Sequence, residues 1–325
     1  MNTLLLSAVV TCAVCYPVLL LLRHSGQFDM PNTRSSHVVP TPRGGGLALL
    51  VGVAAAALAA LLAGPAWSAS AWAAVLGCAA LALMGLTDDV CGLAAKPRLV
   101  AQAAIGAVVG ATLGGWAGAV LGAIVIPAAV NMVNFMDGIN GISAGHAVVW
   151  GASAMAASAY AGSDVLTVLG ALSLGCGLGF LPWNAPKARL FLGDGGSYLL
   201  GGFAGLGVLA AATGVLAGGS EVDQWLLLGL VCAPYLLFAA DTATTLARRY
   251  GRGESLFQAH RSHVHQRLVH DQGLPHWVVS AAVSGLSALA AWAVTGGVVV
   301  GVTTAVLLTA AYLNAPRLVD RRVSL

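Results

Sequence analysis

The chain has 325 residues, of which 58% are hydrophobic and only 8% are charged, and its formal net charge is +3. Water-soluble domains carry about 25% charged residues, so this composition excludes an ordinary soluble fold. Apolar runs of about 17–25 residues recur along the whole length, and the alternating pattern of a β-barrel is absent. These features predict an all-α polytopic membrane protein embedded in the lipid bilayer, and no nucleic-acid partner is expected.

The apolar runs predict about eleven transmembrane helices within a single domain that covers residues 1–325. The first run lacks a basic leading segment and a clear cleavage site, so we interpret it as an uncleaved span. The expected spans are 2–22, 45–64, 69–87, 99–114, 116–131, 144–161, 164–181, 197–217, 224–245, 276–294 and 297–314.

The 15 Lys and Arg residues all fall on one side of an alternating count of these spans. The opposite loops carry only Asp164, Glu221 and Asp223. By the positive-inside rule the basic side is cytoplasmic, which puts the N-terminus outside and the C-terminus in the cytoplasm. Nearly all the acids, His and Asn residues lie on the same side, so we expect the active site at the cytoplasmic membrane face. The cytoplasmic loops are expected near 23–44, 88–98, 132–143, 182–196 and 246–275.

Two adjacent carboxylates, Asp88 and Asp89, end the third expected span, and Lys96 and Arg98 follow in the same loop. Adjacent carboxylates repel each other, so they need a metal ion, a cation or solvent. A solvated helix end is the alternative interpretation of this pair.

Four polar residues, Asn131, Asn134, Asp137 and Asn140, are spaced three apart at the end of the fifth expected span. That spacing predicts that they follow one helix face for as long as the helix lasts. Asn amides and Asp carboxylates suit a nucleotide base, a ribose or a hard cation. A helix N-cap at Asn140 would explain only part of this pattern.

Asp194 lies among Gly193, Gly195 and Gly196, immediately before the eighth expected span. Glycines let the backbone approach a ligand closely. Asp194 also stands at the N-terminus of the following helix, where a simple N-cap is the alternative interpretation. Phe191 precedes it and could stack on a base.

The segment HRSHVHQ, at 260–266, interleaves His263 and His265 with Arg261. A zinc site is conceivable because His at such spacings can bind zinc. However, no Cys lies nearby, and the arginine would repel a cation. Arg together with His suits phosphate oxygens better, so we favour anion binding.

Together these groups favour phosphoryl transfer. Carboxylates alone would repel a phosphate, whereas carboxylates that hold Mg²⁺, or Mn²⁺ in its place, would bind a pyrophosphate between Arg, Lys and His side chains. The alternatives are a lipid pyrophosphate phosphatase and a transporter of a sugar nucleotide or anion. Transporters place ionisable groups near the bilayer midplane, where the sequence offers only Asp241 and His146.

Several segments resemble a known family of membrane enzymes: DDV with a following KPRLVAQ, NMVNFMDGING, FLGDGGSYLLGG and HRSHVHQRL. The first-loop segments PNTRSSH and PTPRGGG match as well. The family is that of the polyprenyl-phosphate N-acetylhexosamine-1-phosphate transferases, which includes phospho-MurNAc-pentapeptide translocase. The pattern HRxHxxQRL is nearest the branch that initiates O-antigen or cell-wall polysaccharide.

The resemblance implies transfer of a HexNAc 1-phosphate from a UDP-sugar, by default UDP-GlcNAc, to undecaprenyl phosphate, with release of UMP. This would be the first membrane step of an envelope polysaccharide, at the bacterial plasma membrane. A UDP-6-deoxy-HexNAc donor is the alternative, and a homodimer is conceivable. Asn140 replaces an Asp that many bacterial members carry, which removes one negative charge near the uridine.

The resemblance also implies the roles of the site residues. They are Asp194 as the Mg²⁺ ligand, Asp88 and Asp89 for catalysis and the acceptor phosphate, Asn134, Asp137 and Asn140 for the nucleotide, Phe191 against the uracil, and Lys96, Arg98, Arg261, His263 and His265 for phosphates.

Overall fold

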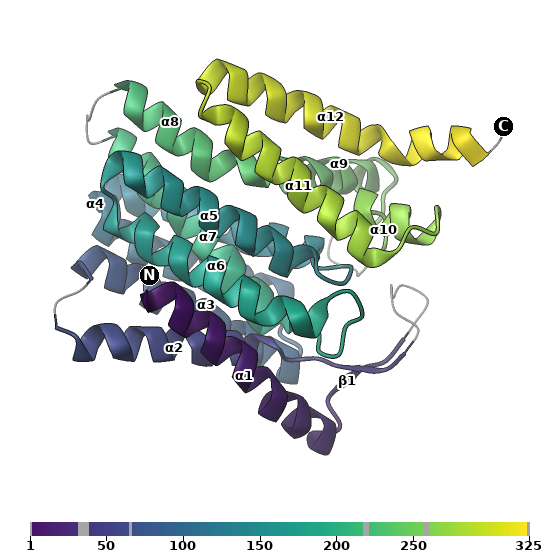
Figure 1. Cartoon of the computed structure of the whole chain (residues 1–325), viewed down its shortest axis with the longest axis horizontal. Helices are drawn as coiled ribbons and strands as arrows, with labels where there is room; N and C mark the ends of the chain where they lie inside the picture. Colours follow the sequence, from purple (N-terminus) through teal and green to yellow (C-terminus); the bar gives the residue numbers. More distant parts are fainter. Residues whose placement is uncertain (1, 32–38, 65–66, 217–220, 256–259, 324–325) are drawn as a thin grey trace.

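The computed structural model describes residues 2–31, 39–64, 67–216, 221–255 and 260–323, and within these ranges the chain is almost entirely helical (Figure 1). The all-α prediction is therefore confirmed. Most of the first-loop motif PNTRSSH, at 32–37, lies outside the described residues. A short antiparallel sheet pairs β1 (Phe28–Asp29) with β2 (Thr41–Pro42).

The helices have the following bounds: α1 (Asn2–Ser25), α2 (Gly46–Leu62), α3 (Ala69–Cys91), α4 (Ala95–Met136), α5 (Ile142–Ala161), α6 (Asp164–Asn184), α7 (Gly193–Leu216), α8 (Glu221–Cys232), the 3₁₀ turn η1 (Ala233–Tyr235), α9 (Leu236–Gly251), α10 (Val264–His270), α11 (His276–Val294) and α12 (Val298–Val323).

Eight helical segments of the described chain are long and apolar enough to cross a membrane. One of them, α4, has 42 residues, and its backbone angles are non-helical at Gly114 and Gly115, where we predicted a break between two spans. The shorter α2 and the less apolar α5 occupy the remaining expected spans, 45–64 and 144–161. The helices therefore lie where the sequence predicts them, while the number of crossings and the orientation stay predictions.

The two halves of α4 pack against each other through glycines. A Cβ on Gly106 would collide with the carbonyl oxygen of Gly122, and one on Gly110 with that of Gly118. Facing small residues let helix backbones approach closely, as in many membrane helix pairs. Since the lower number of one half pairs with the higher number of the other, α4 is an antiparallel hairpin that returns the chain to the end where it began.

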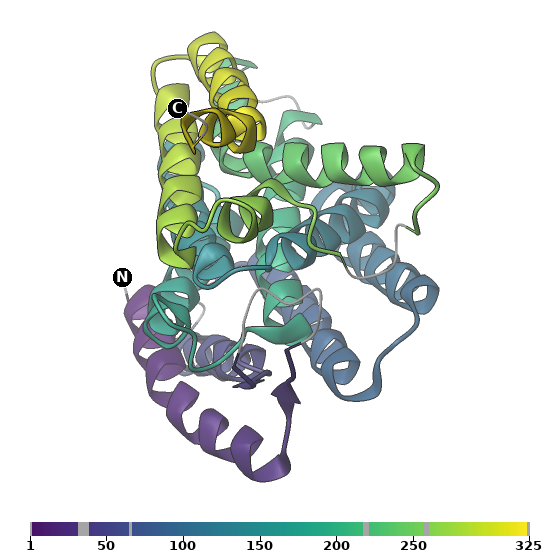
Figure 2. The ribbon, with the colours of Figure 1, turned by 90° about the vertical axis from the view of Figure 1, so that its right-hand side faces the viewer.

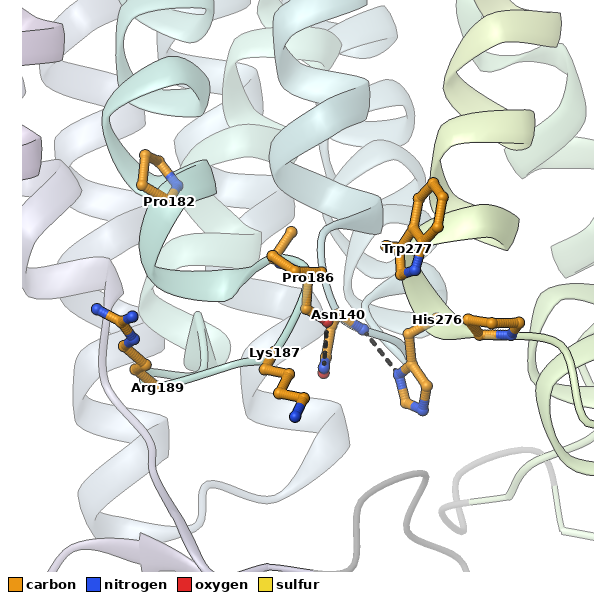
Figure 3. A pocket seen from close by; sticks show the side chains of 9 residues that line it. Asn140, Pro182, Pro186, Lys187, Arg189, His276 and Trp277 are labelled. Atoms are coloured by element: carbon orange, nitrogen blue, oxygen red, sulfur yellow. Dashed lines mark hydrogen bonds between the residues drawn. The ribbon is translucent and has the colours of Figure 1, made fainter.

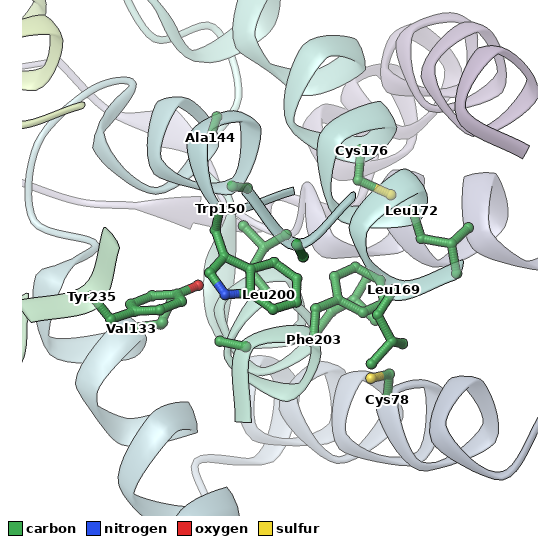
Figure 4. Close-up of a cluster of buried hydrophobic side chains, with 14 of the residues drawn as sticks. Cys78, Val133, Ala144, Trp150, Leu169, Leu172, Cys176, Leu200, Phe203 and Tyr235 are labelled. Atoms are coloured by element: carbon green, nitrogen blue, oxygen red, sulfur yellow. The ribbon is translucent and has the colours of Figure 1, made fainter. Parts of the chain in front are cut away.

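The core lies where α5, α6 and α7 meet (Figure 4). Trp150 of α5 is fully buried there, and its indole N–H donates to the carbonyl of Val231 over 3.1 Å. The ring packs against Gly207 of α7, where a Cβ would collide with it. Phe203 and Leu169 complete the contact as fully buried neighbours. Interiors packed this densely have little freedom to shift, so these helices form a rigid frame for the polar end of the bundle.

The polar loops gather at one end of the helix bundle. β1 and α10 mark this end at the right of Figure 1, and it faces the viewer in Figure 2. Helix α3 ends here with Gly92 in the left-handed conformation, at a φ of 63°, which is a common way to stop a helix. Its last turn carries Asp88 and Asp89 and lies beside the first turn of α7.

Candidate active site

The centre of the candidate site is the first turn of α7, which Asp89 of α3 caps. Its carboxylate accepts the backbone N–H of Asp194 over 2.9 Å and that of Gly195 over 3.0 Å. A carboxylate is stabilised there because the first N–H groups of a helix have no helical partner. Gly193 has a φ of 74°, and a Cβ on it would lie 2.6 Å from Oδ2 of Asp89. Gly193 therefore makes room for the carboxylate of Asp89.

Arg43 joins Asp89 to Asp194. Its Nε lies 3.0 Å from Oδ1 of Asp89, and its Nη2 donates to Oδ1 of Asp194 over 2.8 Å. The loop of Arg43 is fixed by Phe191, whose N–H donates to the carbonyl of Pro42 over 2.8 Å. The rigid guanidinium fork suits two carboxylates at once. The structure thus places a cation between the two carboxylates for which the sequence predicted catalysis and metal binding.

This role of Arg43 was not predicted from the sequence, where Arg43 is only one of the basic residues expected on the cytoplasmic side. The loop reads PRGGG, and Gly46 at its end packs so closely on the backbone of Gly195 and Gly196 that a Cβ would collide. Two glycine-rich segments that each carry a charged residue were the available signal. The two segments can approach closely because their contact is made by Gly46, Gly195 and Gly196, which have no side chains.

Asp88 lies next to Asp89 in sequence but has different partners. Its Oδ2 accepts a hydrogen bond from Nη1 of Arg98 over 2.5 Å and another from the hydroxyl of Tyr198 over 2.8 Å. Its Oδ1 accepts a backbone N–H over 2.7 Å. The two adjacent carboxylates therefore avoid mutual repulsion by pairing with different arginines. Lys96 is exposed and contacts no carboxylate in the described part of the chain, so it does not join this cluster.

Asn134 and Asp137 face the starts of α7 and α5. The hydroxyl of Ser197 donates to Oδ1 of Asn134 over 3.2 Å, and the hydroxyl of Ser143 donates to Oδ1 of Asp137 over 2.7 Å. Burial raises the pKa of Asp137 to about 6, against the opposing effects of Ser143 and Arg43. The charge of Arg43 also acts on Asp137. Asn134 and Asp137 therefore belong to the same cluster as Asp89, Asp194 and Arg43.

Asn131 and Asn140 lie elsewhere, so the four residues expected on one helix face do not share it. The amide of Asn131 donates to Oε1 of Gln102 over 2.6 Å and holds the two halves of α4 together. The helix ends before Asp137, and the backbone N–H of Asn140 donates to Nδ1 of His276 over 3.2 Å (Figure 3). Asn140 opens onto a separate hollow of about 790 Å³ whose lining includes cationic and aromatic side chains and no carboxylate: Lys187, Arg189, His276 and Trp277.

The histidine loop covers the end of α4. The rings of His263 and His265 stack with centroids 5.5 Å apart, and His263 also stacks on Phe135 with centroids 6.5 Å apart. Both imidazoles contact Asp241 of α9, which sequence analysis considered only as a transporter residue. Arg261 is exposed beside them.

The donor groups bear on metal binding. The described ranges contain no set of three or more His, Cys, Asp or Glu side chains arranged to hold a metal ion, and this includes the described histidines of the loop. Within the same ranges, Oδ1 of Asp194 and Oδ1 of Asp137 accept hydrogen bonds while the second oxygen of each accepts none. Mg²⁺ is usually bound by one or two carboxylates plus substrate phosphates. These residues therefore fit a divalent cation that enters with a phosphorylated substrate better than a preformed cage.

The fold and the site define a multi-pass membrane protein with carboxylates, arginines and histidines gathered at one end of its helix bundle. Residues 71–214 match the Glycosyl transferase family 4, a stretch that includes Asp88, Asp89, Asp137 and Asp194 but neither Arg43 nor the loop of His263 and His265.

Three curated relatives extend the match. Decaprenyl-phosphate N-acetylglucosaminephosphotransferase of Mycolicibacterium smegmatis is 32% identical over 82% of this chain and 74% of its own length. The protein of the same name from Mycobacterium tuberculosis is 30% identical over the same shares. Phospho-N-acetylmuramoyl-pentapeptide-transferase of Moorella thermoacetica is 34% identical over 66% of this chain and 75% of its own length. The chain belongs to the polyprenyl-phosphate N-acetylhexosamine-1-phosphate transferase family.

Proposed function

We propose that the protein transfers N-acetylglucosamine 1-phosphate from UDP-GlcNAc to undecaprenyl phosphate or a polyprenyl phosphate of similar length, and releases UMP. The observation that carries this proposal is the Arg43 bridge between Asp89 and Asp194 at the N-terminus of α7. The names of the mycobacterial relatives support the N-acetylglucosamine donor. A UDP-6-deoxy-HexNAc is the second candidate donor. The reaction would start an envelope polysaccharide at the cytoplasmic face of the plasma membrane.

The chemistry is an attack of one phosphate on another. An oxygen of the lipid phosphate attacks the phosphorus that carries the sugar, the bond from that phosphorus to the oxygen of UMP breaks, and the sugar–oxygen bond stays intact. The second pKa of a phosphate monoester is near 6, so the acceptor is largely dianionic at neutral pH and needs no strong base. The barrier is charge repulsion between the lipid phosphate and the donor pyrophosphate, so catalysis depends on cations and positioning.

Asp194 and Asp137 would hold Mg²⁺ through their second carboxylate oxygens. When bound, the ion would offset the negative charge of the donor pyrophosphate. Arg43 would then exchange its contact with Asp194 for a phosphate oxygen of the donor. Asn134, which accepts a hydrogen bond from Ser197 of α7, would contact the nucleotide end.

The adjacent carboxylates would act mainly by positioning. Asp89 holds the first turn of α7, and Asp88 holds Arg98 together with Tyr198. In this arrangement Arg98 binds the lipid phosphate while Asp88 fixes its guanidinium. This assigns the Asp pair to the support of catalytic cations, since the dianionic acceptor has no proton to lose.

The test uses purified protein, radiolabelled UDP-GlcNAc, undecaprenyl phosphate and Mg²⁺. We expect label in the lipid product and one UMP per lipid formed, and we expect Asp194→Asn to lose at least about 100-fold in kcat. The matched control is Asp164→Asn, because Asp164 accepts the N–H of Ser68 far from the cluster and should leave turnover near wild type. Vesicle uptake of the sugar nucleotide without a lipid product would instead identify a transporter, and near-normal turnover of Asp194→Asn would remove this residue from the metal role.

A further inference from the structure

Asp241 is a fully buried carboxylate in α9, on a helix face that also buries Leu237 and Phe238. Its two oxygens accept hydrogen bonds from Thr245 over 3.1 Å, from the backbone N–H of Val264 over 3.0 Å and 3.1 Å, and from the hydroxyl of Tyr312 over 2.7 Å. The Nδ1 atoms of the two loop imidazoles lie 3.2 Å and 3.4 Å away. Every partner of this carboxylate is a donor, as an ionised buried carboxylate requires.

These contacts fix the tautomer of both imidazoles. An ionised carboxylate can only accept, so Nδ1 of His263 and Nδ1 of His265 each carry the proton that points to Asp241. The opposite nitrogen, Nε2, is then a bare acceptor in each neutral ring. A neutral ring in this tautomer cannot donate to a phosphate, because its only N–H is already engaged.

The Nε2 atoms of both rings lack a partner in the described part of the chain, and that of His265 lies beside the turn that follows Asp137. Nε2 of His263 and Nε2 of His265 are buried and have no hydrogen-bond partner among the described residues. Nε2 of His265 lies 2.9 Å from the point that a Cβ on Gly138 would occupy, in the turn that follows Asp137. Two unpartnered buried nitrogens at the edge of a carboxylate and arginine cluster are costly unless a ligand satisfies them.

We propose that Asp241 is a positioning residue that holds His263 and His265 so that the donor phosphates bind only when the imidazoles take up protons at Nε2. The inference rests on the proposed function, because the ligand is the pyrophosphate of the nucleotide sugar. Each ring, once protonated, donates Nδ1–H to Asp241 and Nε2–H to a phosphate oxygen, and solvent supplies the proton. Donor binding is therefore linked to proton uptake.

The surroundings of His265 favour a neutral ring before the donor binds. Burial lowers the pKa of His265 below its ordinary value, and the charge of Asp241 opposes this only in part. Within the described ranges, two further titratable groups lie against this cluster: His260, which stacks on His263 with centroids 5.0 Å apart, and Tyr312 of α12, which donates to Asp241. Arg249 of α9 acts electrostatically on His260. Burial also lowers the pKa of His260 to about 4, so this ring is neutral as well.

The experiment is calorimetric titration of the purified protein with UDP-GlcNAc and saturating Mg²⁺, without lipid acceptor, in two pH 7.5 buffers of different ionisation enthalpy. The difference in heat gives the protons taken up for each donor bound. We expect about two protons for the wild type, one for each ring, and less than half of that uptake for Asp241→Asn. The matched control is Asp271→Asn, an exposed carboxylate that pairs with Arg267, which should keep the wild-type uptake.

A variant of the rings themselves covers the case in which Asp241→Asn does not fold. The double substitution of His263→Gln and His265→Gln leaves Asp241 in place and should also abolish the uptake. Donor binding with no proton uptake, or with wild-type uptake in either variant, would overturn the inference but leave the proposed function standing. No binding of UDP-GlcNAc to the wild type would refute the proposed function itself.

Discussion

Replacing Arg43 by alanine removes the only cation that touches both Asp89 and Asp194 among the described residues. In the substrate-free protein, the two carboxylates then face each other without a shared counter-charge. In the variant, the donor pyrophosphate also lacks the guanidinium of Arg43. In our proposal this guanidinium moves from Asp194 to a phosphate oxygen during the reaction. The variant therefore acts on turnover and on the affinity for Mg²⁺ in the absence of nucleotide.

The size of each effect follows from burial. The Arg43 side chain is 40% exposed, so solvent screens its ion pairs, and we expect their loss to cost about 1 kcal/mol of folding stability or less. A charge-assisted hydrogen bond to a buried phosphate contributes about 1.5–3 kcal/mol, which corresponds to about a 10- to 150-fold loss in kcat/KM. Removal of the cation should meanwhile strengthen Mg²⁺ binding to the unpaired carboxylates.

The assay combines lipid-linked product formation with thermal unfolding in detergent at increasing Mg²⁺ concentration. We expect Arg43→Ala to lose about 10- to 100-fold in kcat/KM and to be stabilised by lower Mg²⁺ concentrations than the wild type. Arg43→Lys should be intermediate, because an ammonium cannot span two carboxylates as a guanidinium does. The control is Arg252→Ala, whose side chain is 71% exposed and pairs only loosely with Glu254. If Arg43→Ala keeps wild-type kcat/KM and wild-type Mg²⁺ dependence, the proposed exchange of partners is wrong.

Three further substitutions test the frame around the site. Gly138→Ala places a methyl group 2.9 Å from Nε2 of His265, so we expect about tenfold slower lipid-product formation with nearly unchanged thermal stability. Turnover equal to that of the wild type would mean that the position of this histidine does not affect the reaction. Gly118→Ala forces the halves of α4 apart and should lower the free energy of unfolding in detergent by about 1–3 kcal/mol. The control Gly285→Ala has open space around its Cβ and should be neutral or slightly stabilising. Similar effects of both substitutions would contradict the hairpin. Tyr198→Phe removes the hydroxyl that helps hold Asp88, so we expect the KM for undecaprenyl phosphate to rise by about tenfold, and an effect on the KM for UDP-GlcNAc alone would contradict the assignment.

The helical framework could be predicted from sequence because its signals are local. Apolar runs fix where the helices lie, and the break at Gly114 and Gly115 falls between the two expected spans 99–114 and 116–131. The pairing of Gly106 with Gly122 and of Gly110 with Gly118 was not predictable, since it depends on which faces of the two halves meet. Local pattern therefore gives the elements, and packing gives their contacts.

The acids of the site were also predictable, but their partners were not. Asp89 and Asp194 stand out as polar residues next to apolar runs, yet the contact between them crosses 105 positions of sequence. Arg43 lies 151 positions from Asp194, and no periodicity relates them. Asp241 was given no role in the site for the same reason, because the two imidazoles that contact it lie in a loop more than twenty residues further along the chain. An ionisable residue inside an apolar run is a transport residue in one fold and an anchor for a loop in another, and only the contacts distinguish them.

One principle of charge relates the three parts of the site. The side-chain cations to which the proposal gives a role are each held by a carboxylate in the structure: Arg43 by Asp89 and Asp194, Arg98 by Asp88, and the two imidazoles, once protonated, by Asp241. A cluster of unpaired cations at the end of an apolar bundle would be costly, and unpaired carboxylates would repel the substrates. Pairing them gives a nearly neutral resting site that can exchange carboxylate oxygens for phosphate oxygens of the same geometry. The affinity for the donor then depends on the difference in free energy between the cation–carboxylate bonds that are lost and the cation–phosphate bonds that are formed. Small changes in the contact between a carboxylate and its cation should therefore alter catalysis more than they alter folding stability.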